Sequence, residues 1–434
     1  MHILHKLNKL YHEPINMSFF QNILSSVMKS TRRLNRFGSK GFGKLHNDIN
    51  KAVNSVMSTT GEVSTLVYAE HLLNLIEKQN DIDLKKFLKN LLANYDIDTK
   101  KLLKDTKTYA SDKNEINLKK INISSEPKWI ELFRRLNSTS NGTFRLVKLR
   151  ERIRALNDIE LKTFDSGLLK LFKYWFNPSF LVLEKIDWET PANILEKIIE
   201  YEAVHEINSW DDLRARLAPS DRQCFAFFHP LIPNDPLIFV EVALCDGAPK
   251  SIQKIIKIDR NEIDIEKANT AIFYSISNCH NGLLGISFGN FLIKKVAKNL
   301  KRELPELNQF LTLSPLPGFL RWMEEYAPIT YEKCVEKNCP DEELMKKAIK
   351  YLTESDRADG MPNDAVARFH VGNGASLERI NLNADMSEKG LTQSYGIMAN
   401  YLYDLDVVEE NHEIFFAKKV VPISKEIKSL KKNL

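Results

Sequence analysis

A glycine-rich turn is the first feature of this sequence that could bind a ligand. Residues 281–290, NGLLGISFGN, contain Gly282, Gly285 and Gly289 and lead into a helix predicted over 291–304. Backbone amides at such a turn can approach a pyrophosphate closely, and the helix dipole favours its negative charge. Glycines between a strand and a helix also serve simple chain reversal. The spacing is not the dinucleotide fingerprint, and no Gly-Lys-Ser or Gly-Lys-Thr follows, so neither a Rossmann site nor a triphosphate loop is indicated.

Three other residues have side chains suited to acid–base or hydrogen-bond chemistry. Ser314 precedes a proline at a predicted strand end, where a serine more often caps the next turn or helix. His370 follows Phe369 in a predicted strand and precedes Gly372, where a ligand or a structural hydrogen bond could engage its ring. Tyr403 lies in an alternation of aromatic and apolar residues that usually signifies packing. Pattern alone leaves both interpretations open at all three positions.

A strand, a helix and a second strand must position these groups. Residues 271–278 predict a strand with two faces, one formed by Ile272, Tyr274 and Ile276 and the other by Phe273, Ser275 and Ser277. The helix over 291–304 has an apolar stripe and a basic face, which could reach phosphates but is more commonly a solvated surface. Residues 309–315 supply a second strand ending at Ser314. A helix that connects two strands in this way predicts a parallel pair.

The chain before residue 177 is predicted to be helical. Apolar residues recur at three- and four-residue intervals in 65–79, 84–95, 129–137, 144–157 and 161–176. Asn177 and Pro178 interrupt this pattern, and after a further short helical stretch β-type runs follow at 224–230, 236–244 and 270–277. We therefore expect an α+β protein with two domains, a helical bundle over 1–176 and a mixed sheet with helices over 177–434.

Composition excludes several classes of protein. The 434 residues exceed the size at which one hydrophobic core usually stops growing. Hydrophobic residues at 43% and charged residues at 27% are typical of a soluble globular protein, and no uninterrupted apolar run of about 18 residues could span a bilayer. The net charge of +5 falls short of a nucleic-acid-binding surface and suits an anionic small molecule.

The cysteines predict neither disulfides nor a metal site. They are five in number and scattered along the chain, at Cys224, Cys245, Cys279, Cys334 and Cys339. An odd, scattered set does not form a secreted-type disulfide framework, so a reducing compartment is expected. Cys334 and Cys339 have no second Cys or His pair at zinc-ligand spacing, and we predict no metal.

The two ends of the chain carry ambiguous targeting signals. The first 47 residues hold eight Lys or Arg and a single acid, Glu13, which resembles a transit peptide, although a basic first helix of a bacterial protein fits better. The final Lys432, Asn433 and Leu434 echo a peroxisomal address without its small first residue. We expect a cytoplasmic protein, with a mitochondrial or peroxisomal location as the alternative.

Six segments together resemble the malonyl-CoA decarboxylase family. They are YEAVHEI, PLIFVEVAL, AIFYSISN, LSPLPGF, FHVGNGA and GIMANYLY, in this order and with the spacing of that family, and they cover most of residues 175–410. The resemblance implies a lyase of fatty acid metabolism that converts malonyl-CoA to acetyl-CoA and carbon dioxide without a cofactor. It also implies a C-terminal catalytic domain of the acetyltransferase-like (GNAT) fold, in which two parallel strands separate and the CoA pyrophosphate lies on the loop between them.

The same resemblance implies roles for particular residues. Ser314 and His370 would be catalytic, and Ser275 and Tyr403 match further active-site positions. The CoA moiety would be cradled by Leu284, Gly285, Ile286, Ser287, Phe288, Gly289 and Asn290. Loss of carbon dioxide leaves an enolate, so His370 would donate a hydrogen bond or deliver a proton from a near-neutral pKa, and Ser314 would fix the carboxylate or the donor.

Two other functions remain open. The same core could present acetyl-CoA to an amine, as an acyl-CoA-dependent N-acyltransferase, or the chain could be a non-catalytic acyl-CoA-sensing module. The stretch between Phe319 and Phe369 is shorter than in animal members of the family, which bears on oligomer contacts and substrate gating. We expect malonyl-CoA and acetyl-CoA as partners, a homo-oligomer, and no nucleic acid.

Overall fold

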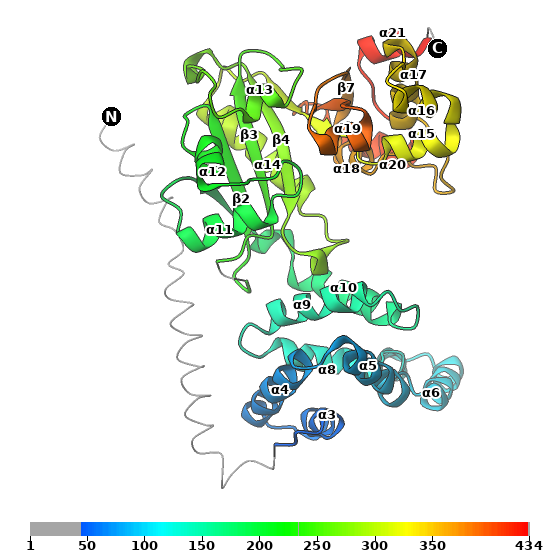
Figure 1. Cartoon of the computed structure of the whole chain (residues 1–434). Helices are drawn as coiled ribbons and strands as arrows, with labels where there is room; N and C mark the ends of the chain where they lie inside the picture. The colour runs from blue at the N-terminus through cyan, green and yellow to red at the C-terminus, as the bar shows by residue number, and fades with distance from the viewer. Residues whose placement is uncertain (1–44, 233, 433–434) are drawn as a thin grey trace. The chain divides into compact units, whose positions relative to one another are not determined.

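The chain forms two compact units, shown with their elements in Figure 1. The computed structural model describes residues 45–232 and 234–432, so the transit-like stretch before residue 45 and the last two residues lie outside it. The first unit contains the described residues through Trp175 together with His280–Gly285. The second contains Phe176–Cys279 and the chain from Ile286 onward.

The first unit is built from helices. They are α3 (Ile49–Ser58), α4 (Glu62–Glu77), α5 (Asp81–Tyr95), α6 (Thr99–Ser111), α7 (Glu115–Ser124), α8 (Lys128–Asn137), α9 (Gly142–Ala155) and α10 (Lys162–Trp175). Asn80 and Asp98 cap α5 and α6 by accepting a backbone N–H in the first turn. Apolar side chains at helical spacing, such as Leu88, Phe133 and Phe164, are fully buried. All five predicted helices are confirmed.

The second unit begins with a mixed sheet. Its first elements are β1 (Val182–Ile186), α11 (Ala192–Tyr201), α12 (Trp210–Leu217), β2 (Arg222–Phe228), β3 (Ile238–Cys245), α13 (Gln253–Ile256), β4 (Thr270–Asn278), α14 (Gly289–Glu303), β5 (Gln309–Thr312) and β6 (Ser314–Pro315). Strands β1 to β4 are antiparallel neighbours, whereas β4 and β5 pair in parallel through the crossover helix α14. The predicted strands and parallel pair are confirmed, except that the strand predicted over 309–315 is divided into β5 and β6. The predicted helical stretch after Pro178 is preceded by β1, a short edge strand with weak alternation.

The remaining chain completes the sheet and covers it. It contributes α15 (Phe319–Tyr326), α16 (Pro328–Val335), α17 (Asp341–Thr353), α18 (Ala365–Gly372), β7 (Ser376–Asn381), α19 (Glu388–Ser394), β8 (Met398–Leu402), α20 (Val408–Lys418) and α21 (Lys425–Lys432). Strand β8 pairs with β5, β6 and β7, all antiparallel. The predicted fold class, a helical region followed by a mixed sheet with helices, is confirmed, and the β4–α14–β5 crossover fits an acetyltransferase-like core.

His370 lies on a helix, so the strand predicted around it is wrong. Asp364 caps α18 by accepting the Ala367 N–H at 2.6 Å, and the helix ends where Asn373 donates its N–H to carbonyls of the last turn. The apolar run around Phe369 is short, and such runs do not distinguish a strand from a buried helix.

A bulge in β4 changes which residues share a face. The pairing register between β3 and β4 shifts by one residue at the bulge. Glu241 pairs with Ser275 and Val242 pairs with Phe273, so Tyr274 has no partner in β3. The two serines Ser275 and Ser277 therefore lie on the same face as Ile272, not opposite it as the regular alternation predicts. That face is covered by α11, α12 and α13, and α14 covers the other.

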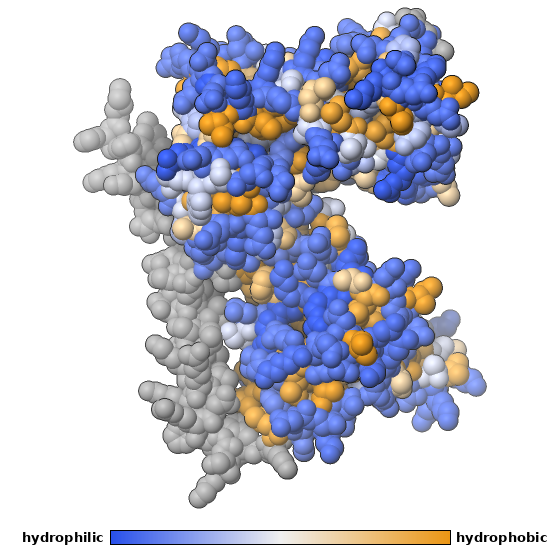
Figure 2. Space-filling view, in the orientation of Figure 1, coloured by the Kyte–Doolittle hydropathy of each residue, from blue (hydrophilic) through white to orange (hydrophobic). Residues whose placement is uncertain are grey.

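Polar residues dominate the surface. Figure 2 shows mostly hydrophilic residues on the visible face of the described elements, with apolar residues in small groups between them. Scattered exposed apolar side chains are normal on a folded chain. Within 45–232 and 234–432, no helix is long and apolar enough to cross a membrane.

Candidate active site

The two central parallel strands separate at the point where the predicted serines lie. Strands β4 and β5 are in register from Thr270 with Gln309 to Phe273 with Thr312. Beyond this pair β4 continues beside β3 only, while β6 turns to pair with β8. Ser275 and Ser314 each follow the last paired residue by two positions. The separation of the strands thus brings one serine from each side to the end of the paired region.

Ser314, His370 and Tyr403 form a buried hydrogen-bond chain. The Ser314 Oγ lies 3.0 Å from His370 Nε2, and the His370 Nδ1 lies 2.9 Å from the Tyr403 hydroxyl. The three residues come from β6, α18 and the position directly after β8, and all are buried. Ser314 therefore does not cap the following helix, and Tyr403 does more than pack. These residues are 56 and 33 positions apart in the sequence.

Neighbouring groups hold this chain in place. Ser314 Oγ is 2.9 Å from Thr312 Oγ1, which accepts the backbone N–H of Tyr401 at 3.1 Å. The Tyr401 ring stacks on the His370 imidazole, with centroids 4.7 Å apart and planes inclined by 25°. The imidazole is thus fixed both in its plane and against its face.

Burial keeps the His370 imidazole neutral. It lowers the pKa of His370 to about 3, because the charged form is poorly solvated there. Burial likewise raises the pKa of the Tyr403 hydroxyl. The near-neutral pKa expected for His370 is therefore wrong. At neutral pH the residue offers one N–H and one lone pair.

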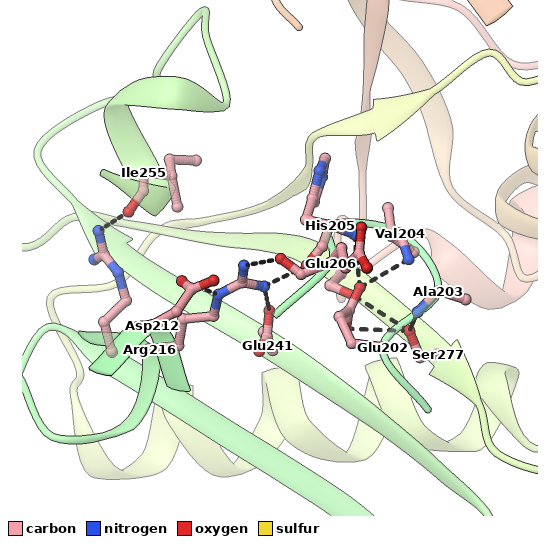
Figure 3. Close-up of polar contacts among 12 residues, drawn as sticks. Glu202, Ala203, Val204, His205, Glu206, Asp212, Arg216, Glu241, Ile255 and Ser277 are labelled. Atoms are coloured by element: carbon pink, nitrogen blue, oxygen red, sulfur yellow. Dashed lines mark hydrogen bonds and ion pairs between the residues drawn. The ribbon is translucent and has the colours of Figure 1, made fainter. Parts of the chain in front are cut away.

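Ser275 belongs to a second cluster, around Glu202. Figure 3 shows Glu202 of this cluster with Ser277 and Val204. Its Oγ lies 2.8 and 2.7 Å from the two carboxylate oxygens of Glu202, and Ser277 Oγ lies 3.2 Å from one of them. The same carboxylate accepts the backbone N–H groups of Val204 and His205, both at 2.8 Å. Glu202 follows α11 and thus ties the chain after this helix to β4.

Arg216 and Glu241 extend the ionic cluster (Figure 3). Arg216, on α12, donates to Glu241 at 3.3 Å and to the carbonyls of His205 and Glu206 at 2.7 and 2.9 Å. Burial, with the nearby Glu202, raises the pKa of Glu241 to about 8. Glu241 consequently holds its proton at neutral pH.

These ionic residues were missing from the predicted site. Glu241 carried a signal, because it interrupts the otherwise apolar run of β3 and a buried carboxyl requires a partner. No sequence pattern indicated Glu202 or Arg216, because their contacts join positions up to 75 residues apart. The segments YEAVHEI and PLIFVEVAL contain the two carboxylates but do not reveal that they meet.

The predicted CoA loop runs from the first unit into the second. Leu284 and Gly285 group with the helices, where Arg150 of α9 binds the carbonyl of Leu284 at 2.9 Å. Gly285 has a φ of +92°, a conformation that favours glycine. Ile286 to Asn290 belong to the second unit, with Ser287 exposed and Phe288 buried.

Gly289 has a packing role that the sequence does not suggest. A Cβ there would lie 2.3 Å from the Phe369 ring, next to His370. A bulky substitution at Gly289 would therefore displace Phe369 and cannot serve as a clean probe of phosphate binding. The basic face of α14 is partly engaged as well: Lys294 pairs with Glu409 at 3.0 Å, and Lys301 binds two backbone carbonyls.

No group of three or more His, Cys, Asp or Glu within 45–232 and 234–432 could hold a metal ion. The five cysteines are free.

Comparisons with known proteins match both units. The malonyl-CoA decarboxylase C-terminal domain matches residues 179–339 and 329–434, and the malonyl-CoA decarboxylase N-terminal domain matches residues 95–176. The mitochondrial malonyl-CoA decarboxylase of Anser anser anser is 34% identical over 349 residues, which are 70% of this chain and 69% of the Anser protein. That of Rattus norvegicus is 33% identical over 351 residues, 70% of this chain and 71% of the rat protein.

Solved structures agree with these matches. Malonyl-CoA decarboxylase from Rhodopseudomonas palustris superimposes with a TM-score of 0.84 and 40% identity, covering 89% of this chain and 100% of that one. The enzyme from Agrobacterium vitis gives a TM-score of 0.84 and 42% identity over 88% of this chain and 99% of that one. The chain therefore belongs to the malonyl-CoA decarboxylase family, whose members are carboxy-lyases.

Proposed function

We propose that the chain converts malonyl-CoA to acetyl-CoA and carbon dioxide at the cluster formed by Ser314, His370 and Tyr403. The observation that carries this proposal is the buried hydrogen-bond chain joining the three residues. In the reaction the bond between the α-carbon and the carboxylate breaks and carbon dioxide leaves. The electron pair of the broken bond stays on the thioester fragment and forms its enolate. A proton must then reach the α-carbon.

His370 supplies a fixed neutral donor. We assign the Tyr403 O–H as donor to His370 Nδ1, so that the single imidazole proton resides on Nε2 and points toward Ser314. An N–H fixed beside Ser314 in a water-poor site can be shared with an enolate oxygen bound next to the Ser314 hydroxyl, and it stabilises that oxygen without reorganisation. Because burial disfavours the imidazolium, His370 acts through this hydrogen bond, and the carbon takes its proton from water.

Ser314 completes the donor arrangement. Its hydroxyl lies between His370 Nε2 and Thr312 Oγ1 and can turn its hydrogen toward a bound carboxylate or oxyanion. We assign it to orienting the leaving carboxylate. No covalent attack is required, because the carbon–carbon bond breaks without acyl transfer.

The loop Leu284–Asn290 is our proposed contact for CoA. It precedes α14, whose first backbone N–H groups have no partner within the helix and whose dipole favours phosphate. Support comes from the exposure of Leu284, Gly285 and Ser287, and from the positive φ of Gly285. Acetyl-CoA would leave by the same contact.

The compartment and the oligomeric state are proposals too. We propose a cytoplasmic homo-oligomer, with mitochondria as the alternative because the Anser and Rattus relatives are named mitochondrial. Fractionation of cells that carry the tagged chain and light scattering of the purified protein test the two statements separately.

The central experiment compares wild type with His370→Asn and Ser314→Ala. Single-turnover release of carbon dioxide is measured with a strong chelator and no added cofactor, alongside the dissociation constant of acetyl-CoA. We expect release to slow by roughly a hundredfold or more in either variant, as for loss of one oxyanion donor, with far smaller changes in affinity. A near-normal release rate in a folded variant would remove that residue from the chemistry. Activity that vanishes with chelation and returns with a divalent ion would refute the cofactor-free reaction.

A further inference from the structure

The direction of the hydrogen bond between Ser275 and Glu202 limits what Ser275 can do. Both oxygens of Glu202 lie within 2.8 Å of Ser275 Oγ. An ionised carboxylate only accepts hydrogen bonds, and a serine hydroxyl has a single hydrogen to give. Ser275 therefore donates to Glu202, and only its lone pairs remain for any other contact.

Other hydrogen-bond donors also surround the Glu202 carboxylate. Two backbone N–H groups, of Val204 and His205, and the Ser277 hydroxyl also point at its oxygens. Both Glu202 oxygens therefore already accept hydrogen bonds, and Ser275 is the donor in its contact with them. The other buried carboxyl nearby, Glu241, holds the proton instead, because burial and the charge of Glu202 raise its pKa to about 8.

The segment 202–206 is held from three directions. Arg216 of α12 binds the carbonyls of His205 and Glu206, as described above. Lys389 of α19 binds the carbonyls of Ala203 and Val204 at 2.6 and 3.2 Å. Ser277 of β4 accepts the N–H of Ala203 at 3.2 Å. Such a segment cannot adjust easily, so Glu202 approaches Ser275 from a fixed direction.

We propose that Glu202 is a positioning residue that fixes the polarity of Ser275, so that Ser275 meets the substrate only as a hydrogen-bond acceptor. This inference rests on the proposed function. The malonyl carboxylate and the thioester oxygen have no hydrogen to offer, so Ser275 does not bind them. Its partner is a donor, either the amide N–H nearest the thioester in the pantetheine arm or the water that protonates the enolate.

Glu202→Gln tests this assignment with little change of shape. The amide oxygen can retain the N–H groups of Val204 and His205, while the amide nitrogen replaces the oxygen nearer Ser277 and becomes a donor toward Ser275. Ser275 can then donate only to the amide oxygen, while the new N–H occupies one of its lone pairs, so its capacity to accept from the substrate falls and the backbone contacts remain. We expect kcat/KM to fall roughly ten- to hundredfold, the usual range for one hydrogen bond with a charged partner. Glu206→Gln, the same change at an exposed side chain of this segment, is the matched control and should change kcat/KM less than about threefold.

A double-mutant cycle separates positioning from a structural role. If Glu202 acts through Ser275, then Glu202→Gln has no further effect once Ser275→Ala is present. Losses that multiply in the double variant would overturn the inference. A loss confined to the affinity for acetyl-CoA identifies the amide N–H as partner, whereas a loss confined to single-turnover protonation identifies the water. If Glu202→Gln does not fold by circular dichroism, Glu202→Asp takes its place in the cycle.

The parallel His370→Asn variant separates failure of the proposed reaction from failure of the Glu202 assignment. If it retains activity, the proposed function fails, whatever the cycle shows. If it loses activity while the cycle is multiplicative, only the assignment of Glu202 fails.

Discussion

Two buried polar clusters of the second unit solve different problems. The cluster of Ser314, His370 and Tyr403 is uncharged, and its members touch through single hydrogen bonds. The cluster of Glu202, Arg216 and Glu241 contains charged groups, and four of its hydrogen bonds go to backbone groups. The cluster of Ser314, His370 and Tyr403 has no charge of its own, so it can stabilise charge that develops during a reaction. The second already has its charge compensated and serves to hold the chain after α11 against the sheet.

The comparison predicts that the ionic cluster governs stability. Arg216 is buried among Asp212, the protonated Glu241 and two carbonyls, so Arg216→Met leaves Asp212 without its cation and the other groups without their donor. Breaking a buried pair from one side typically costs about 3–5 kcal/mol. We expect a loss of this size in the free energy of unfolding, measured by urea denaturation at pH 7.

Arg214 on the same helix is the matched control. Its guanidinium is exposed and lies 4.6 Å from the centre of the Trp188 ring, a contact worth about 0.5–1 kcal/mol at an exposed site. Arg214→Met should therefore cost little. Equal losses in the two variants would show that burial of the Arg216 cluster does not matter.

The raised pKa of Glu241 predicts that stability falls as pH rises. In the unfolded chain the carboxyl loses its proton near its ordinary pKa of 4.5, whereas in the folded protein it keeps the proton to about pH 8. Between these values the native state binds more protons, so the free energy of unfolding decreases with pH and levels off above pH 8. Glu241→Gln cannot ionise and should lack this decrease. The difference should reach a few kcal/mol at pH 9, since each tenfold change in a protonation equilibrium is about 1.4 kcal/mol.

The measurement is the urea midpoint of both proteins at pH 5, 7 and 9. Wild type and Glu241→Gln should differ least at pH 5. If the difference between the two urea midpoints stayed constant from pH 5 to pH 9, the folded protein would not retain the Glu241 proton.

Substitutions in the neutral cluster of Ser314, His370 and Tyr403 should lower the reaction rate more than the free energy of unfolding. Tyr403→Phe removes the donor to His370 Nδ1, so the imidazole proton can move away from Ser314. We expect single-turnover release to slow roughly tenfold, about the worth of one neutral hydrogen bond, with unchanged acetyl-CoA affinity. Tyr401→Phe is the control, because the Tyr401 hydroxyl has no hydrogen-bond partner within the described residues and its ring would still stack on His370. A larger effect at Tyr401 would contradict the proposed tautomer.

The sequence predicted the residues of the neutral cluster but not those of the ionic cluster. Helices with a clear apolar stripe, such as α14, and the crossover between β4 and β5 follow from periodicity and connection length. Ser314, His370 and Tyr403 were named through resemblance, while their contact depends on β6, α18 and β8 meeting in space. The ionic cluster escaped prediction because one extra residue, Tyr274, turns Ser275 toward Glu202. Neither the bulge nor a contact across 73 residues leaves a periodic trace.

The smallest expected effect concerns pH and the rate. Because burial lowers the pKa of His370 to about 3, the imidazole stays neutral from pH 8 down past pH 5. An exposed histidine would titrate near pH 6.5 and lose about nine-tenths of its neutral form by pH 5.5. Single-turnover release should thus vary less than about twofold between pH 5.5 and 8 through this group.

The free energy of unfolding depends on pH differently. The unfolded chain takes up a proton near pH 6.5, whereas the native state binds it only near pH 3, so stability falls as pH drops through this window. Rates are therefore compared only where circular dichroism shows a folded protein. An acid limb near pH 6.5 that is present in wild type and absent from the residual activity of His370→Asn would show that His370 titrates, and the neutral donor would have to be abandoned. A limb that persists in His370→Asn belongs to another group and leaves the distinction between the neutral and ionic clusters intact.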